Sequence, residues 1–139
     1  MRAIFRFIAG AAAVAVLAIG SLLVVAPASA LTATNYTPAS LAAAQASGKP
    51  FLIDFFATWC TTCKAQERAI EGLIEENPAY GDIPIIRVDW DENERGELVR
   101  AMGIPRRSTL VVMAGETELG RLVAATGRDQ IAALLDLAL

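Results

Sequence analysis

The chain has 139 residues, which is long enough for one ordinary domain and a targeting segment but not for two domains. Its formal net charge is −3, and residues 31–139 carry all 15 acidic side chains but only 10 of the 12 lysines and arginines. No basic cluster is present to neutralise phosphates, so we expect no nucleic-acid partner.

The first 30 residues have the layout of a secretory signal peptide. Two arginines near the start are followed by an apolar run, and the segment ends in Ala28-Ser29-Ala30. Small residues there fit a signal peptidase, so we predict that residues 1–30 are a signal peptide that is cleaved after its last residue. The alternative is an uncleaved anchor, because the stretch from Phe7 to Ala26 is long enough to span a bilayer. We expect a periplasmic or otherwise exported domain over residues 31–139.

Apolar and turn patterns in the exported part predict alternating strands and helices. The first predicted elements are an edge strand over 31–36, a helix over 39–47 capped by Thr37, a buried strand over 51–57, a helix over 60–76 and a buried strand over 83–88. The later ones are a helix opened by a capping box of Asp91 and Glu94 and ended by Gly103, a hairpin of strands over 109–113 and 118–123, and a last helix capped by Thr126 and Asp129.

This element order limits the topology of the sheet. The strand–helix–strand unit over 51–88 is parallel and right-handed. The hairpin over 109–123 has a short connection that contains glycine, so its strands are antiparallel. We therefore predict an α/β fold, with a mixed central β-sheet of four or five strands flanked by helices on both faces.

The two cysteines, Cys60 and Cys63, stand where a buried strand gives way to a helix. A bridge between them closes only a four-residue segment and removes little unfolded-state entropy, so a structural staple is a poor explanation. Free N–H groups and the positive dipole at a helix start stabilise an anion. We therefore expect a Cys60 thiolate that attacks disulfides, with a pKa below the ordinary value of about 8.5. Cys63 can then resolve the mixed disulfide.

The sequence Trp59-Cys60-Thr61-Thr62-Cys63-Lys64, after a buried strand, resembles the active site of the thioredoxin family, and the resemblance covers nearly all of residues 36–139. It implies the thioredoxin fold and thiol:disulfide oxidoreductase activity, with Cys60 as nucleophile and Cys63 as resolving thiol. Asp54 matches the buried acid of the family and would take or relay the Cys63 proton; the alternative is that it caps a local group or merely tolerates a half-buried site. Trp59 would lie on the rim where substrates bind, or is simply a packed aromatic.

One part of the active site departs from the family pattern. Thioredoxins carry a cis-proline directly before a strand that begins with threonine, opposite the cysteines. Pro105 fills this position only if three residues intervene before Thr109; in the alignment that we favour, Ser108 fills it without an insertion. A cis bond before a residue other than proline costs about 2.5–4 kcal/mol, so we predict a trans peptide before Ser108. Ser108 and Thr109 are the expected substrate-binding residues of this loop.

The remaining features bear on the direction of electron flow and on partners. Strongly oxidising relatives usually carry a histidine between the cysteines, and this chain has no histidine, so we expect a reductase or isomerase role rather than that of a primary oxidase. Arg106 and Arg107 would lie beside the cysteines, where they lower the pKa of Cys60 and select acidic partners or are merely solvated. We expect protein thiol and disulfide substrates, a membrane-borne dithiol donor, and a monomer without organic cofactor or resident metal.

Two other functions stay open at this point. A copper-binding module would use the same cysteine pair, because two thiolates can hold Cu(I), although related copper proteins add a histidine. A pure interaction domain would leave the disulfide without a chemical role.

Overall fold

The computed structural model describes residues 33–139, and the predicted signal peptide, residues 1–30, lies outside this range. A five-stranded sheet occupies the centre of the described part, in the order β1-β3-β2-β4-β5. The strands are β1 (Ala33–Asn35), β2 (Pro50–Phe56), β3 (Ile85–Asp89), β4 (Thr109–Ala114) and β5 (Thr117–Val123). The helices are α1 (Pro38–Ala46), α2 (Thr61–Glu76), α3 (Trp90–Asn93), α4 (Glu97–Ala101) and α5 (Arg128–Leu135), with short 3-10 helices η1 (Pro78–Asp82) and η2 (Asp136–Ala138).

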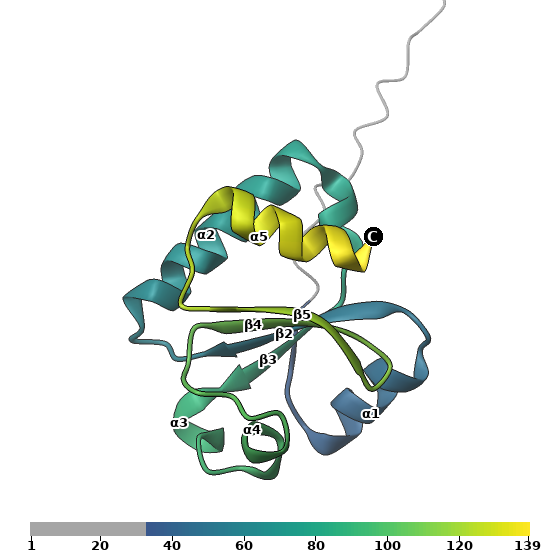
Figure 1. The fold of residues 1–139 in the computed structure, drawn as a ribbon, viewed down its shortest axis with the longest axis vertical. Coiled ribbons are helices and arrows are strands. Elements are labelled where there is room, and N and C mark those ends of the chain that lie inside the picture. Colours follow the sequence, from purple (N-terminus) through teal and green to yellow (C-terminus); the bar gives the residue numbers. More distant parts are fainter. Residues whose placement is uncertain (1–32) are drawn as a thin grey trace, which may run out of the picture.

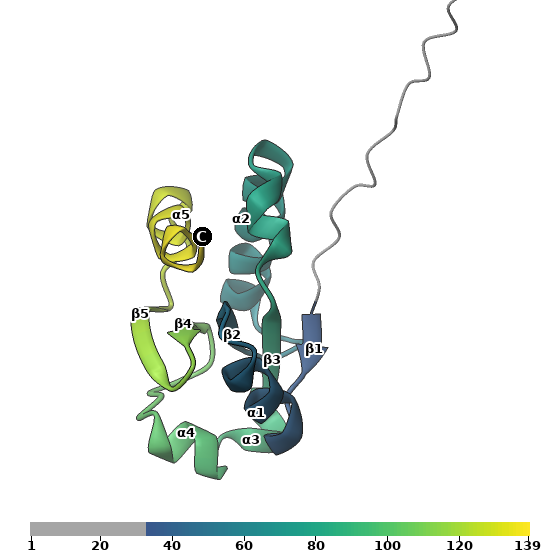
Figure 2. The same cartoon turned by 90° about the vertical axis from the view of Figure 1, so that its right-hand side faces the viewer.

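The sheet is mixed, as the sequence predicted. Strands β1 and β2 each pair with β3 in parallel, whereas β4 pairs antiparallel with both β2 and β5. Helices α2 and α5 lie on one face of the sheet, and α1, α3 and α4 lie on the other (Figures 1 and 2). The prediction of a mixed sheet flanked by helices on both faces is therefore confirmed.

Two hydrophobic cores flank the central strand β2, because alternate side chains of a strand point to opposite faces. Leu52 packs with α2 and α5 residues such as Ile70 and Ile131. Phe51, Ile53 and Phe55 belong to the other core, against α1 and α4. The apolar run of β2 reflects burial on both faces, and Asp54 shares the Leu52 face, the one that α2 covers.

The helix predicted to begin at a capping box is different in the structure. Asp89 caps α3 by accepting a hydrogen bond from the Asp91 N–H at 2.9 Å, so Asp91 is inside the helix rather than before it. A tight turn at Gly96 then separates α3 from α4. A Cβ at this glycine would lie 2.9 Å from the Asn93 carbonyl oxygen, so the turn needs glycine. The predicted end is confirmed: Gly103, with φ +58°, follows α4.

The N-terminus of α5 also differs from the prediction. Gly127 occupies the N-cap position without a side-chain hydrogen bond, so neither Thr126 nor Asp129 caps this helix. Thr126 lies one residue too early, and Asp129 is already in the first turn, where its charge still favours the helix dipole. At α1, in contrast, Thr37 is the N-cap as predicted.

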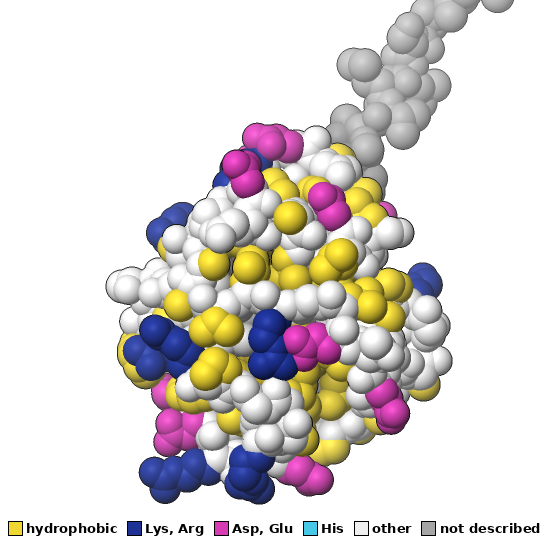
Figure 3. Space-filling model, viewed as in Figure 1, with side chains coloured by type: hydrophobic (Ala, Val, Ile, Leu, Met, Phe, Trp, Pro, Cys, Tyr) yellow, Lys and Arg dark blue, Asp and Glu magenta, His cyan; other side chains and the backbone are white. Residues whose placement is uncertain are grey.

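Acidic and basic side chains are interspersed on the face shown in Figure 3 and do not form one basic patch there. Within residues 33–139, no helix combines the length and apolar character needed to cross a membrane.

Candidate active site

The disulfide between Cys60 and Cys63 lies at the first turn of α2, and the two Cα atoms are 5.3 Å apart. Cys60 is the N-cap of the helix, and its Sγ accepts a hydrogen bond from the Cys63 N–H at 3.1 Å. A free backbone donor of the helix start thus points at the sulfur of Cys60, as the sequence predicted. Cys60 is only 4% exposed and Cys63 only 6%, so a partner must fit closely against the protein to react.

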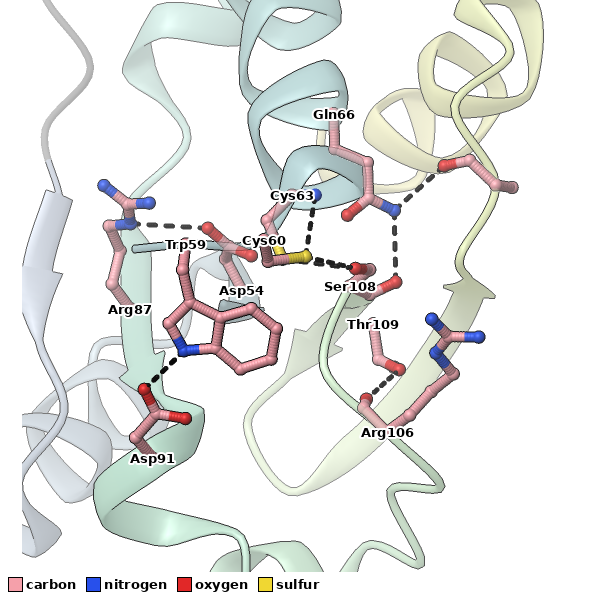
Figure 4. The surroundings of a disulfide bond; sticks show 11 residues. Asp54, Trp59, Cys60, Cys63, Gln66, Arg87, Asp91, Arg106, Ser108 and Thr109 are labelled. Atoms are coloured by element: carbon pink, nitrogen blue, oxygen red, sulfur yellow. Dashed lines mark hydrogen bonds and ion pairs between the residues drawn. A yellow bond between two sulfur atoms is a disulfide. The ribbon is translucent and has the colours of Figure 1, made fainter. Parts of the chain in front are cut away.

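Ser108 lies directly against both sulfur atoms (Figure 4). Its Oγ is 3.1 Å from the Sγ of Cys60 and 3.1 Å from the Sγ of Cys63, and the residue is completely buried. The residues that the structure describes contain no cis peptide bond, so the peptide before Ser108 is trans, as predicted. Its φ of +60° lies in the left-handed region, where residues other than glycine are uncommon.

Both backbone groups of Ser108 are bound within the protein. Its N–H donates to the carbonyl of Phe55 at 2.7 Å, and its own carbonyl accepts from the Ala124 N–H at 2.8 Å. The Gln66 side chain donates a further bond to this carbonyl at 3.2 Å and another to the Ala125 carbonyl at 2.9 Å. Substrate binding by Ser108 and by its equally buried neighbour Thr109 stays a prediction.

Gln66 is a functional residue that the sequence analysis missed. It is 1% exposed, although glutamine is usually found on the exposed side of a helix. The available signal was its spacing: Gln66 follows Cys63 by three residues and so lies on the same face of α2. A buried polar side chain at that place joins the helix to the loop that carries Ser108.

Asp54 lies on β2 beneath the start of α2 and faces Arg87, its partner in the parallel register with β3. The Arg87 Nε is 3.3 Å from the Asp54 Oδ2, an ion pair without hydrogen-bond geometry, and Arg87 also donates to Glu67 at 3.2 Å. Burial raises the pKa of Asp54 to about 6; the Arg87 charge opposes this rise, and the Glu67 charge adds to it. Asp54 therefore changes its protonation close to neutral pH, as a proton relay requires.

Arg87 and Glu67 were not singled out from the sequence. A basic residue inside the buried run Ile85–Val88 was a usable signal, because such a charge needs a partner on the same face. The Arg87 guanidinium also lies over the ring of Phe56, with its carbon 3.9 Å from the ring centroid.

Two hollows are lined in part by the ion pair of Arg87 and Glu67. One of about 220 Å³ is lined by Cys63, Glu67 and Arg87 among others, and one of about 300 Å³ is lined by Asp54 together with the same Glu67 and Arg87. Each is large enough for water molecules. Cys63 and Asp54 thus each border a hollow, and the two hollows share Glu67 and Arg87 in their linings.

Trp59 projects beside the disulfide and is 54% exposed. Its Nε1–H donates to the Asp91 carboxylate at 2.7 Å, and the Arg107 guanidinium carbon lies 4.1 Å from the ring centroid on its face. The indole is therefore held at two places while much of its surface stays open, which suits a binding rim. Arg106 is exposed, and its carbonyl accepts a bond from the Thr109 hydroxyl at 2.7 Å.

No group of three or more histidine, cysteine, aspartate or glutamate side chains in the part from Ala33 onward is arranged to hold a metal ion.

Comparison with known proteins agrees with this geometry. Residues 29–137 match the thioredoxin family profile. The thioredoxin of Mycobacterium tuberculosis is 35% identical over 83 residues, 59% of this chain and 67% of the relative. That of Alicyclobacillus acidocaldarius is 29% identical over 100 residues, 71% of this chain and 90% of the relative. The bifunctional thioredoxin reductase/thioredoxin of Mycobacterium leprae is 32% identical, but the chain spans only 17% of its length.

Solved structures give the same result. Trxlp from Edwardsiella tarda superposes with a TM-score of 0.63 at 31% identity, over 76% of this chain and 97% of that one. The thioredoxin of Malassezia sympodialis, 21% identical, shares the fold with a TM-score of 0.62 over 78% of this chain and 95% of that one. The chain is thus a member of the thioredoxin family, with the thioredoxin fold and the redox-active cysteine pair of a thiol:disulfide oxidoreductase at the start of α2.

Proposed function

We propose that this protein is exported and reduces disulfides in protein substrates through Cys60 and Cys63. The observation that carries the proposal is the position of the Cys60 sulfur at the start of α2, where the Cys63 N–H donates to it at 3.1 Å. This donor and the helix dipole favour the thiolate, the form that attacks a disulfide. The absence of histidine from the chain supports the reducing direction, and the character of residues 1–30 supports export.

The reaction proceeds in two exchanges of sulfur partners. The Cys60 thiolate attacks one sulfur of the substrate disulfide; a mixed disulfide forms, and the other substrate sulfur leaves as a thiolate and takes up a proton. Cys63 then loses its proton and attacks the Cys60 sulfur, which releases the second substrate thiol. Two electrons pass from the protein to the substrate, and the Cys60–Cys63 disulfide remains.

Asp54 receives the proton of Cys63 in this scheme. Its pKa of about 6 lets it accept a proton and release it again near neutral pH. The hollow beside Cys63 and the hollow beside Asp54 share Glu67 and Arg87 in their linings, which supports a proton transfer through water between the two residues. In the exported compartment, a membrane-borne dithiol donor would reduce the protein again after each cycle.

Substrates would bind on the surface around Trp59, which is half exposed and lies next to the nearly buried sulfurs. Arg107 on the indole face and the exposed Arg106 give this rim positive charge, although residues 31–139 have an excess of acidic side chains. We therefore propose that acidic segments near a disulfide are favoured substrates.

An insulin reduction assay with dithiothreitol as electron source tests the catalytic assignment. We expect Cys60→Ser to abolish turnover and Cys63→Ser to accumulate a mixed disulfide with the substrate. Turnover by Cys60→Ser at the wild-type rate would contradict the assignment. Tight stoichiometric Cu(I) binding by a reduced protein without dithiol turnover would favour the copper-binding alternative.

Direction and export need separate measurements. The reduction potential of the pair against glutathione should lie near the thioredoxin value of about −270 mV, and a value near about −120 mV would indicate an oxidant instead. Expression of the full chain in a bacterium should give a periplasmic protein whose measured mass is that of a chain beginning at Leu31. An intact Met1 in the exported protein would contradict cleavage.

A further inference from the structure

A single hydroxyl group faces both reacting sulfurs. The Oγ of Ser108 lies 3.1 Å from each of them, and the residue is fully buried. Its backbone is held by hydrogen bonds with the Phe55 carbonyl and the Ala124 N–H, which place the Cβ of Ser108 beside the cysteine pair. A serine hydroxyl has one proton, which turns toward one acceptor or the other by rotation about the Cβ–Oγ bond.

The strength of this contact depends on the redox state. The sulfur of a disulfide is a weak hydrogen-bond acceptor, whereas a hydrogen bond to an ionised acceptor is about twice as strong as one between neutral groups. The hydroxyl therefore stabilises a thiolate much more than it stabilises the disulfide. We propose that Ser108 is a catalytic residue, whose hydroxyl donates in turn to the Cys60 thiolate and then to the Cys63 thiolate during exchange.

The two steps of the reaction need this donor at different sulfurs. Before the first attack, the Cys60 thiolate accepts from the Cys63 N–H and from the Ser108 hydroxyl. Once the mixed disulfide has formed, the Cys60 sulfur is neutral, and negative charge must develop on Cys63 instead. The hydroxyl then rotates to the Cys63 sulfur without any movement of the backbone. The inference rests on the proposed exchange reaction of this pair, but not on its direction or on export.

The backbone conformation is a second observation in favour of a role for the hydroxyl. Ser108 has a φ of +60°, a conformation that glycine adopts most readily and that costs other residues free energy. Glycine would meet the needs of the backbone here, and it would leave the sulfurs without the donor. The contact of the side chain with both sulfurs is what serine adds.

The test compares Ser108→Gly and Ser108→Ala with the wild type. Both variants remove the hydroxyl, and glycine also relieves the backbone. In each, the pH profile of Cys60 alkylation by iodoacetamide should move to higher pH, because the pKa of the thiol rises. The equilibrium constant with glutathione, measured above the pKa of Cys60, should shift about tenfold toward the disulfide, or about 30 mV.

A second readout isolates Cys63. Reduced protein releases two thionitrobenzoate ions from Ellman's reagent, the first when Cys60 attacks and the second when Cys63 resolves the mixed disulfide. In the Ser108 variants, the thiolate fraction of Cys63 should be about tenfold smaller, and the higher nucleophilicity of the more basic thiol offsets part of this loss. The second release should therefore slow about threefold. Tyr80→Phe is the control, since it removes a hydroxyl from another buried residue, and this hydroxyl donates to Asp136 at 2.5 Å and not to sulfur.

The outcomes separate a chemical role from a structural one. A shift of the pH profile in both Ser108 variants, with none in Tyr80→Phe, supports the proposal. Unchanged profiles in both variants overturn it, and so does a change in Ser108→Ala that Ser108→Gly lacks, because backbone strain would then be the cause. If the wild type releases both thionitrobenzoate ions but does not reduce insulin, the proposed function is wrong. The pH profiles of Cys60 alkylation then still decide the role of Ser108.

Discussion

Replacing Asp54 by asparagine keeps the shape of the side chain but removes a charge that burial disfavours. The carboxyl has an ordinary pKa of 3.8, and burial raises it to about 6 in the folded protein. The folded protein therefore holds this proton more tightly than the unfolded chain. This stabilising contribution is fully present below pH 3.8 and is lost as the pH rises through about 6.

The size of the effect follows from the pKa difference. A rise from 3.8 to about 6 is a little over two pKa units, and each unit corresponds to about 1.36 kcal/mol. The Asp54 side chain is 16% exposed, so solvent screening reduces this value only modestly. Relative to its protonated form, the Asp54 carboxylate thus lowers the free energy of unfolding by up to about 3 kcal/mol at pH 7.

Urea unfolding of the oxidised protein between pH 4 and pH 8 measures this contribution. We expect Asp54→Asn to be more stable than the wild type by about 3 kcal/mol at pH 7. This advantage should shrink to about 0.5 kcal/mol at pH 4, where the wild-type carboxyl is protonated when folded and only partly ionised when unfolded. The matched control is Glu116→Gln, which removes one negative charge from the exposed turn between β4 and β5. A difference between Asp54→Asn and the wild type that stays constant with pH would refute the reasoning.

Two further predictions concern the partners of the site. Arg87→Met removes the charge that opposes the rise in the Asp54 pKa. In the Arg87→Met background, the advantage of Asp54→Asn should therefore keep growing to a higher pH before it levels off, and its final size should be larger; an unchanged pH dependence would contradict the ion pair. Gln66→Leu removes the amide group that donates to the Ala125 carbonyl and supplies one of the two hydrogen bonds to the Ser108 carbonyl. The free energy of unfolding should therefore fall by about 1–3 kcal/mol, measured as a lower urea midpoint. A urea midpoint equal to that of the wild type would show that the two Gln66 hydrogen bonds do not contribute to stability.

Some parts of the site were predictable because they depend on neighbours in the sequence. The strand before Cys60 and the helix after it follow from apolar periodicity, and together they place the two sulfurs at a helix start. The burial of Asp54 followed from its position inside a run of apolar residues. The trans peptide before Ser108 followed from the energetic cost of a cis bond without proline.

Other parts depended on segments far apart in the chain. Arg87 pairs with Asp54 because β2 and β3 lie side by side in one register, and no local pattern specifies that register. Asp91 was assigned to a helix cap, but its carboxylate binds the indole of Trp59, which is 32 residues away. In the sequence, Gln66 is an ordinary polar residue of a helix surface. It is buried because the loop before β4 and the loop after β5 fold over it.

The sequence by itself determined the order of strands and helices, the mixed sheet and the reactive cysteine pair, because each depends on periodicity and spacing within a short stretch. Only the tertiary structure decided which groups surround the sulfurs. It places Ser108 against both of them, 45 and 48 residues away along the chain, in a left-handed backbone conformation. That conformation is set by hydrogen bonds from β2, α2 and the end of β5, and such long-range contacts exist only once the sheet has assembled.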